Sequence, residues 1–300
     1  MQFNRILLPS KNILTASIAL RSARPSRILL GHAHPRLLMS TILAGYFHYG
    51  TIAHGSDFLA AQNKWHGPLF NVLLRKSRPL ITHSQPIADR LKSLGVCEPV
   101  VIHPGVDRFR FKPSETTRHS KPVILTVGRL VARKGIDTVI RSIPNLLSEL
   151  PDLEYRIGGE GPDRPHLEKL ASELGIRHAV SFLGRVEEEA LPGLYRDADI
   201  FVMPVREDQA SIEGFGMVFL EASASGLPVI AGRSGGAVEA VRDGETGILI
   251  EPDNVDQLAA AILELFINKE KRIRLGNAGR IWVETEMNWD QTAARIAAAL

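Results

Sequence analysis

The sequence Pro122-Val-Ile-Leu-Thr-Val-Gly-Arg-Leu-Val-Ala-Arg-Lys-Gly135 joins a short apolar run to a glycine-containing turn. A segment with helical periodicity follows, as far as about residue 150. An unbroken apolar run of this length is typical of a strand that is buried on both faces of a parallel sheet. The sequence therefore predicts a βα unit whose turn lies at the carboxyl end of a strand, where such sheets bind their ligands.

The same alternation recurs along the chain as far as about residue 286. Further short apolar runs are separated by amphipathic segments, and this order predicts βα repeats around a parallel sheet. We expect strands at residues 153–157, 180–183, 199–203, 228–231 and 247–250, and helices at residues 163–174, 187–196, 215–224 and 255–266.

The first part of the chain has the same α/β character over a shorter length. Strands are expected at residues 28–30, 51–53, 80–82 and 100–103, with a helix at 37–44 and a linker at 107–122. We therefore predict two Rossmann-like domains with parallel sheets. The first, at residues 1–112, is expected to be truncated, because about 150 residues is typical of a domain. The second occupies residues 113–286, and residues 287–300 form a terminal helix that packs back toward the first domain.

Composition excludes several classes of protein. A net charge of +3, from 36 basic and 33 acidic side chains, is too small to indicate a nucleic-acid-binding protein. No run of about 18 apolar residues is present, so a transmembrane helix is not expected. The single cysteine, Cys97, cannot form a disulfide within the chain. A reducing, cytoplasmic location is the simpler interpretation.

The amino-terminal stretch is basic and contains no acidic residue from Met1 to Ser56. It permits two interpretations, a targeting peptide or a face that meets an anionic substrate or lipid. We favour the second, because the stretch has the pattern of strand and helix pieces. Peripheral contact with the inner face of a membrane is then an option. The basic residues are Arg5, Lys11, Arg21, Arg24, Arg27 and Arg36.

Two carboxylates are separated by seven residues in Glu213-Gly-Phe-Gly-Met-Val-Phe-Leu-Glu221. Glu213 is expected on a glycine-containing loop, and Glu221 inside the helix that follows. The start of that helix directs free N–H groups and a positive dipole end toward an anion. A carboxylate at Glu221 can accept two sugar hydroxyls, as acidic residues of dinucleotide-binding folds do.

The turn after residues 122–127 carries cations. Arg129 and Lys134 can both reach a diphosphate, Arg as a fork of donors and Lys as a point charge. Departure of a nucleoside diphosphate leaves negative charge, which fixed cations stabilise. Arg133 is interpreted as a bystander.

Other candidates are weaker when taken singly. Glycine-rich turns follow strands at residues 158–162 and 234–239, and Phe182-Leu-Gly-Arg-Val186 ends another strand. His54 follows the strand expected at residues 51–53, where it could donate a hydrogen bond to a sugar hydroxyl or carry a proton. No cluster has the spacing of a metal site, so no metal is expected.

Taken together, residues 121–287 resemble glycosyltransferase family 4, which has the GT-B fold. The resemblance rests on G-R-L-x-x-x-K-G, the GGEGP turn, F-L-G, E-x7-E, S-G-G-x-x-E and D-G-E-T-G, in this order. The stretch 213–236 is similar to bacterial mannosyltransferases that build phosphatidylinositol mannosides. The first domain of this family usually opens with a strand and a glycine-rich loop. We expect Met1 of this chain to fall after that point.

The resemblance implies a retaining, metal-independent hexosyltransferase that uses a GDP- or UDP-sugar and a glycan or lipid acceptor. The similarity of residues 213–236 to mannosyltransferases suggests mannose as the hexose. Arg129 and Lys134 would hold the diphosphate, and Glu221 the ribose. Glu213 would position the donor sugar, and His54 would contact it. The candidates for the reaction itself are Glu213, His54, Arg129 and Lys134. The full donor-binding set is Gly128, Arg129, Lys134, Gly159, Leu183, Arg185, Glu213, Gly214, Phe215, Gly216, Met217, Val218 and Glu221.

Two alternatives remain open on the sequence alone. One is a non-catalytic or degenerate nucleotide-sugar-binding protein, which the missing glycine-rich loop favours. The other is a sugar-nucleotide epimerase with the GT-B fold, against which the order and spacing of the motifs argue.

Overall fold

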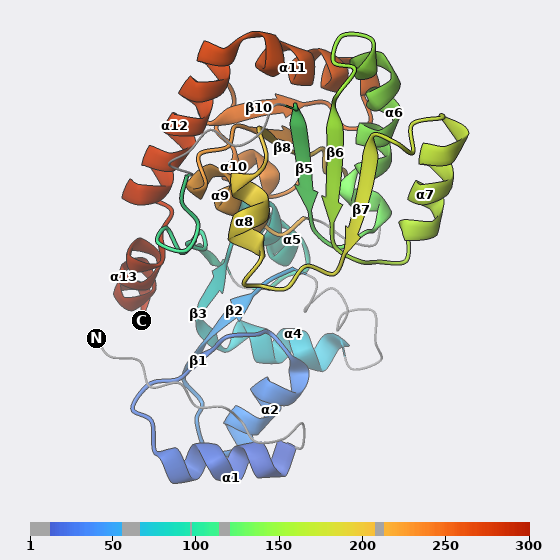
Figure 1. The fold of residues 1–300 in the computed structure, drawn as a ribbon. Helices are drawn as coiled ribbons and strands as arrows, with labels where there is room; N and C mark the ends of the chain where they lie inside the picture. Colours follow the sequence, from blue (N-terminus) through green and yellow to red (C-terminus); the bar gives the residue numbers. More distant parts are fainter. Residues whose placement is uncertain (1–12, 56–66, 97, 114–120, 208–212) are drawn as a thin grey trace. The chain divides into compact units, whose positions relative to one another are not determined.

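The structure is a computed structural model that describes residues 13–55, 67–96, 98–113, 121–207 and 213–300 (Figure 1). The chain divides into two compact units. The first comprises Met1–His103 and Thr292–Leu300, and the second comprises Pro104–Gln291. Each unit is built on one parallel sheet, which confirms the predicted α/β class with two Rossmann-like units. Cys97 and residues 114–120 of the expected linker lie outside the described residues.

The second unit contains a six-stranded parallel sheet in the order β10-β9-β8-β5-β6-β7. Counted from β5, this is the doubly wound order of dinucleotide-binding folds. The direction of winding reverses between β5 and β8, so loops that leave these two strands diverge and leave room for a ligand. The strands are β5 (Val123–Val127), β6 (Glu154–Gly158), β7 (Val180–Gly184), β8 (Ile200–Met203), β9 (Val229–Gly232) and β10 (Gly247–Ile250).

Helices cover both faces of this sheet (Figure 1). Side chains alternate along a strand, so Ile124 packs into one core and Leu125 into the other. The first core is completed by α6 (Ile136–Leu147), α7 (Arg164–Glu173) and α11 (Val255–Ile267). The second is completed by α8 (Leu191–Arg196), α9 (Met217–Ala224), α10 (Ala237–Ala240) and α12 (Lys269–Thr285).

The helix expected at residues 187–196 begins only at Leu191, and this is a correction. Pro192 occupies the first turn of α8. A proline has no N–H and is tolerated in the first turn of a helix but not in its interior. The helix therefore starts beside the proline rather than four residues earlier.

The first unit has a four-stranded parallel sheet in the order β1-β2-β3-β4. Its core is continuous, and the buried Tyr49 hydroxyl donates to the Leu73 carbonyl oxygen at 2.9 Å. The elements are α1 (Ile13–Ala23), β1 (Leu29–Leu30), α2 (Pro35–Leu43), β2 (Tyr49–Ala53), α4 (Gly67–Arg75), β3 (Ser77–Thr82), α5 (Gln85–Ser93) and β4 (Val100–Val101).

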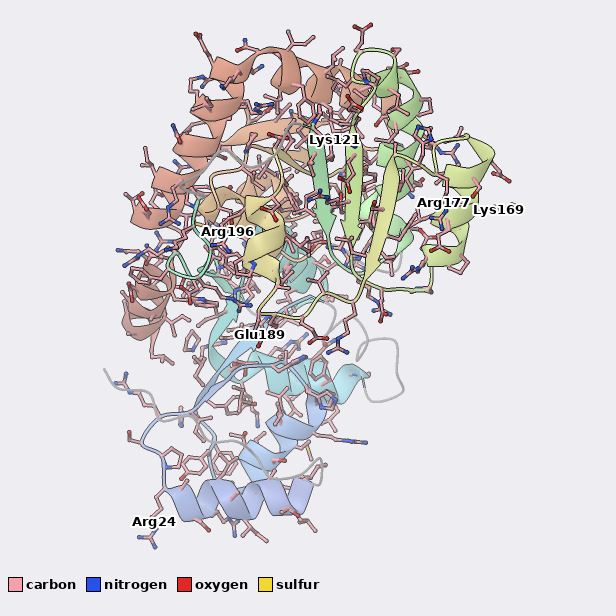
Figure 2. All side chains as sticks on the ribbon, viewed as in Figure 1. Arg24, Lys121, Lys169, Arg177, Glu189 and Arg196 are labelled. Atoms are coloured by element: carbon pink, nitrogen blue, oxygen red, sulfur yellow. The ribbon has the colours of Figure 1, made fainter. Side chains whose placement is uncertain are left out.

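Helix α1 packs on α2 and leaves an amphipathic outer face. Leu14 and Ile18, one turn apart, are 67% and 64% exposed. Arg24 follows the helix and extends away from it (Figure 2). No described helix is long and apolar enough to cross a membrane.

The boundary of the second unit falls earlier than the expected residue 113. Residues 104–111 are tied to α12 and the turn after it. The Val106 N–H donates to the Met287 carbonyl at 3.0 Å. The Arg280 guanidinium donates to the carbonyls of Arg108, Phe111 and Ala224 at 2.7–3.0 Å. Helix α13 (Trp289–Ala299) crosses the other boundary, and from Thr292 onward its residues belong to the first unit.

Candidate functional site

The glycines of the second unit's motifs bring the ends of three strands together. The Gly128 N–H donates to the Gly158 carbonyl at 2.9 Å, and the Gly159 N–H donates to the Gly184 carbonyl at 2.7 Å. A Cβ on Gly159 would lie 1.9 Å from the Gly128 oxygen. Only glycine permits this approach. The turns after β5, β6 and β7 therefore form one continuous rim at the carboxyl edge of the sheet.

A second set of glycines joins the loops that leave β8 and β9. A Cβ on Gly236 would lie 2.2 Å from the Gly214 carbonyl oxygen, and the Gly236 N–H donates to the Glu213 carbonyl at 2.9 Å. Gly216 begins α9 with φ +86°, a left-handed conformation that favours glycine. These contacts fix the backbone of Glu213 and Gly214 against Gly236, just before Met217 and Val218 in the first turn of α9.

The residues of the charge cluster are Arg133, Lys134 and Glu213. The Lys134 ammonium lies 2.8 Å from Glu213 Oε2, and the Arg133 guanidinium contacts the same oxygen. The side chains of Lys134 and Glu213 are each 9% exposed. Burial alone would raise the pKa of Glu213, but the two cations outweigh it and lower that pKa. The carboxylate is therefore ionised at neutral pH, and the cluster carries a net positive charge.

The structure changes which arginine accompanies Lys134. Burial lowers the pKa of Lys134, and the Glu213 charge opposes that shift. Arg129 is exposed, and no ion pair involves it among the described residues. Arg133 belongs instead to a 3-10 turn, η1 (Ala132–Lys134), that directs it toward Glu213. The sequence analysis interpreted Arg133 as a bystander, and in the structure its guanidinium contacts Glu213 beside Lys134.

Glu221 is half-buried on α9 and is paired with a residue that the sequence analysis did not single out. The Tyr195 hydroxyl on α8 donates to Glu221 Oε2 at 2.7 Å. No described residue hydrogen-bonds the other oxygen of that carboxylate. Burial raises the pKa of Glu221, and the tyrosine hydrogen bond partly opposes the rise. A carboxylate held by one oxygen leaves its other oxygen available to a ligand hydroxyl.

The side chains predicted to bracket a base lie at the end of β7. Leu183 is 41% exposed, and Arg185 makes a 3.7 Å ion pair with Glu187 on the surface. Neither joins the charge cluster.

In the first unit, three imidazoles gather at the carboxyl ends of β1, β2 and β3. His54 Nε2 lies 2.8 Å from the Gly31 carbonyl oxygen. The His54 ring centroid is 5.5 Å from that of His32 and 4.8 Å from that of His83. Because parallel strands end at one edge, histidines that follow neighbouring strands meet there. His83 was not among the predicted site residues.

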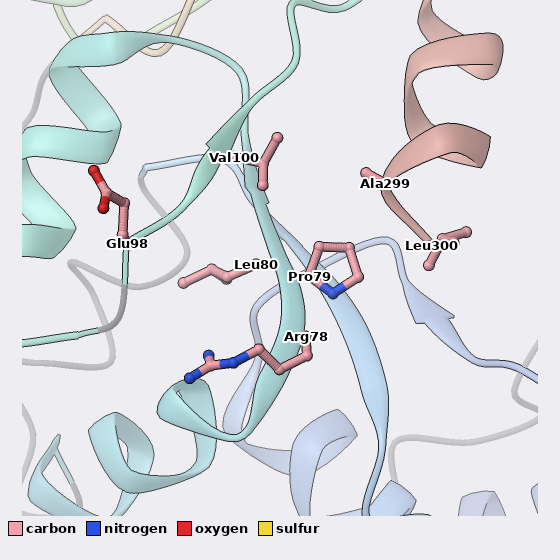
Figure 3. Close-up of a pocket in the computed structure, with 7 residues that line it drawn as sticks. All are labelled: Arg78, Pro79, Leu80, Glu98, Val100, Ala299 and Leu300. Atoms are coloured by element: carbon pink, nitrogen blue, oxygen red, sulfur yellow. The ribbon is translucent and has the colours of Figure 1, made fainter.

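The first unit also has a hollow of about 540 Å³ at the opposite end of β3. Its lining includes Arg78, Leu80 and Glu98, and the close-up in Figure 3 shows Arg78 at the start of the strand. None of the predicted site residues lines it, so its position gives it no part in the site described here.

The residues at the carboxyl edge of the second unit lie within the match to a known family. A sequence model described as "Glycosyl transferases group 1" matches residues 107–282. The chain belongs to this family.

The curated relatives of this group 1 family member include bacterial mannosyltransferases. It is 40% identical over 207 residues to the GDP-mannose-dependent alpha-(1-6)-phosphatidylinositol monomannoside mannosyltransferase of Mycobacterium tuberculosis, covering 65% of this chain and 54% of that protein. It is 38% identical over 228 residues to the GDP-mannose-dependent monoacylated alpha-(1-6)-phosphatidylinositol monomannoside mannosyltransferase of Corynebacterium glutamicum, covering 71% and 59%. The chain spans just over half the length of these relatives.

Solved structures show the same fold for this group 1 family member. Anabaena HepE in complex with UDP and glucose aligns with a TM-score of 0.78 at 20% identity, covering 94% of this chain and 80% of that one. Sucrose-phosphate synthase from Thermosynechococcus elongatus aligns with a TM-score of 0.74 at 22% identity, covering 97% and 79%. At these identities the likeness concerns the GT-B fold alone.

Proposed function

We propose that this protein is a retaining glycosyltransferase of the family 4 type, which transfers a hexose from a nucleotide-diphosphate sugar to a glycan or lipid acceptor. The observation that carries the proposal is the buried cluster of Lys134, Arg133 and Glu213, which lies at the carboxyl edge of β5 and β8 where the sheet order reverses. Two cations and a carboxylate at the edge where this fold binds nucleotides support the proposal.

Each group has a definite part in the proposed reaction. Lys134 and Arg133 hold the diphosphate together with the exposed Arg129. The three cations stabilise the charge that develops on the diphosphate as the sugar departs. Glu221 accepts the ribose hydroxyls through the oxygen that Tyr195 leaves open. Glu213 and the first turn of α9 position the sugar. The acceptor hydroxyl attacks on the face that the diphosphate leaves and gives its proton to the departing phosphate, so the anomeric configuration is retained.

Mannose from GDP-mannose is the donor that we propose first. The support is the similarity to two bacterial enzymes whose names specify GDP-mannose. A UDP-sugar is the alternative donor to test beside it.

We also propose that the reaction needs no metal ion. The diphosphate charge is met by Lys134, Arg133 and Arg129, all on one turn after β5, which is the role that a divalent cation would otherwise play. Transfer in excess EDTA should equal transfer with added Mg²⁺. A rate that EDTA abolishes and Mg²⁺ restores would contradict this part of the proposal.

For the acceptor side we propose peripheral contact with an anionic membrane surface through α1. Its outer face exposes Leu14 and Ile18. Arg21 in its last turn is also exposed and donates to the Leu43 carbonyl, and the exposed Arg24 follows the helix. Residues 13–55 contain no acidic side chain. Apolar side chains beside cations are typical of helices that lie on anionic lipid. Sedimentation with phosphatidylglycerol vesicles should deplete the wild type, whereas the double variant Leu14→Ser, Ile18→Ser should stay in the supernatant.

The donor site is tested by calorimetry of the purified chain with GDP and with UDP, and Lys134→Ala is the variant. Binding of one nucleotide that disappears in Lys134→Ala supports the site, and transfer of mannose from GDP-mannose is then assayed. Failure of a folded wild-type protein to bind either nucleotide would overturn the proposal.

A further inference from the structure

Both cations of the charge cluster contact the same carboxylate oxygen, Oε2 of Glu213. The side chains of Lys134 and Glu213 are each 9% exposed, so water screens their attraction only weakly. Two cationic donors converging on one oxygen is the arrangement by which proteins also hold a phosphate. Glu213 therefore makes contacts that the diphosphate of a bound donor would otherwise make.

The backbone on both sides of the cluster is anchored, so the three side chains stay within reach of one another when a ligand arrives. The Glu213 carbonyl accepts the Gly236 N–H, and the Arg133 carbonyl accepts the Arg206 N–H, both at 2.9 Å. Arg206 is in turn held by Asp137, with an Nη2–Oδ1 distance of 2.9 Å. A diphosphate that enters must therefore compete with the Glu213 side chain for the two cations.

On the basis of the function proposed above, we propose that Glu213 competes with the diphosphate for Lys134 and Arg133, and that this competition selectively weakens binding of the bare nucleoside diphosphate. In a nucleotide sugar both ends of the diphosphate are esterified. The bare product has a terminal phosphate with a second ionisation near pH ~6, so it carries about one more negative charge at neutral pH. The Glu213 carboxylate repels that extra charge.

The sugar of an intact donor changes the balance. When the diphosphate takes the two cations, the displaced carboxylate can accept hydroxyl groups of the sugar, and charged acceptors make strong hydrogen bonds. The product offers no such hydroxyls. After transfer, the carboxylate therefore returns to Lys134 and Arg133 and favours release of the nucleoside diphosphate. Glu213 thus determines specificity for the sugar-bearing nucleotide.

The test is calorimetric titration of the full chain and of Glu213→Gln with two pairs of ligands, GDP with GDP-mannose and UDP with UDP-glucose. For the pair that the wild type binds, Glu213→Gln should bind the nucleoside diphosphate about three- to tenfold more tightly, as expected for loss of one close charge. Its affinity for the nucleotide sugar should not increase. An unchanged or weaker affinity for the nucleoside diphosphate would overturn the inference.

Two further variants separate charge from structure. Glu213→Asp keeps the charge on a shorter side chain and should bind the nucleoside diphosphate no more tightly than the wild type. Glu154→Gln makes the same change to a glutamate paired with Arg156 at 2.8 Å, at the opposite end of β6, and should leave both affinities unchanged. Should Glu213→Gln be unfolded by circular dichroism, Glu213→Ala replaces it with the same expectation.

The outcomes also distinguish this inference from the proposed function. A wild-type protein that binds neither pair overturns both. Alternatively, the wild type binds one pair, while Glu213→Gln shows the same ratio of affinities for the nucleoside diphosphate and the nucleotide sugar. That result overturns only the competition by Glu213.

Discussion

At the scale of single residues, the charge cluster was only partly predictable. Lys134 and Glu213 were both predicted as donor-site residues but not as an ion pair, and they meet because their loops leave β5 and β8 on either side of the point where the sheet order reverses. The choice between Arg129 and Arg133 depends on the direction of the 3-10 turn η1. Arg129 precedes this turn and Arg133 lies on it, and spacing in the sequence does not encode which of the two is directed toward Glu213.

Tyr195 should matter for nucleotide affinity although no motif contains it. Its hydroxyl orients Glu221 through a 2.7 Å hydrogen bond. Tyr195→Phe removes the bond but keeps the buried ring, so nucleotide affinity should fall about three- to tenfold, the effect of one hydrogen bond to a charged group. Calorimetry measures the change. Tyr49→Phe removes the hydrogen bond of a buried hydroxyl in the first unit and should leave the nucleotide affinity unaltered. Equal losses in the two variants would refute the assignment.

The Glu221 carboxylate should lower the free energy of unfolding and increase the affinity for the nucleotide. Burial raises the pKa of this carboxyl above the usual 4.5, so its charged form is disfavoured in the folded protein. As the pH rises, the Glu221 carboxyl of the unfolded chain loses its proton before that of the folded protein. The contribution of Glu221 to stability therefore falls over the pH range between its pKa in the unfolded chain and its pKa in the folded protein. At about pH 7, Glu221→Gln should increase the free energy of unfolding by up to about 1 kcal/mol and weaken nucleotide binding.

Urea denaturation at two pH values tests this prediction. The gain in stability should shrink as the pH is lowered through the pKa of Glu221, because the wild-type carboxyl then becomes neutral as well. A gain that persists undiminished in acid would show that burial of the charge is not its origin.

At the scale of elements, the strands of the second unit were predicted within one residue at either end, because unbroken apolar runs identify buried strands. Several helices could not be predicted from the sequence, and α12 and α1 are two examples. Helix α12 was not predicted, since its charged sequence has little apolar periodicity and few of its residues are buried. Helix α1 was foreseen only as an undefined strand or helix piece. Its packing on α2 depends on tertiary contacts such as the bond from Ser17 Oγ to the Ser40 carbonyl.

The contact between the loops after β8 and β9 should be a large contribution to stability. Gly236→Ala would place a Cβ 2.2 Å from the Gly214 carbonyl oxygen. The backbone would have to move, and we expect a loss of about 2–4 kcal/mol in the free energy of unfolding. Chemical denaturation measures it.

Gly193→Ala is the matched control for Gly236→Ala. Gly193 lies within α8, and a Cβ there would have no neighbour within 4 Å. The control should stabilise the protein by up to about 1 kcal/mol, because alanine favours a helix. If both alanine variants had the same stability, close approach of the two loops would not be what Gly236 provides.

At the scale of the whole molecule, the class of each unit was predictable, but the boundary at His103 and Pro104 was not. Composition suggested a linker up to residue 122. The hydrogen bonds from Arg280 to carbonyls of Arg108 and Phe111 tie that stretch to the second unit. Contacts between residues about 170 positions apart leave no local signal in a sequence.

The second unit should fold and bind nucleotide alone. Residues 104–291 contain the complete six-stranded sheet, both of its cores, and every residue of the charge cluster. A fragment of this length should unfold cooperatively and bind the nucleotide within about threefold of the full chain's affinity, as expected of an autonomous domain. Calorimetry and thermal melting check both statements. A fragment that folds but has lost nucleotide binding would mean that the first unit supplies part of the site.

The glycines that join the strand-end loops bear on how such sequences diverge. Gly159 and Gly236 allow two main chains to touch, and a side chain at either position would collide with a carbonyl oxygen. A descendant of this chain that had abandoned catalysis would still have to keep them in order to fold. The glycine pattern is therefore inherited with the scaffold, whereas Lys134, Glu213 and Glu221 can drift once selection on the chemistry ends. Among diverged homologues, these three side chains rather than the glycines would distinguish active enzymes from inactive ones.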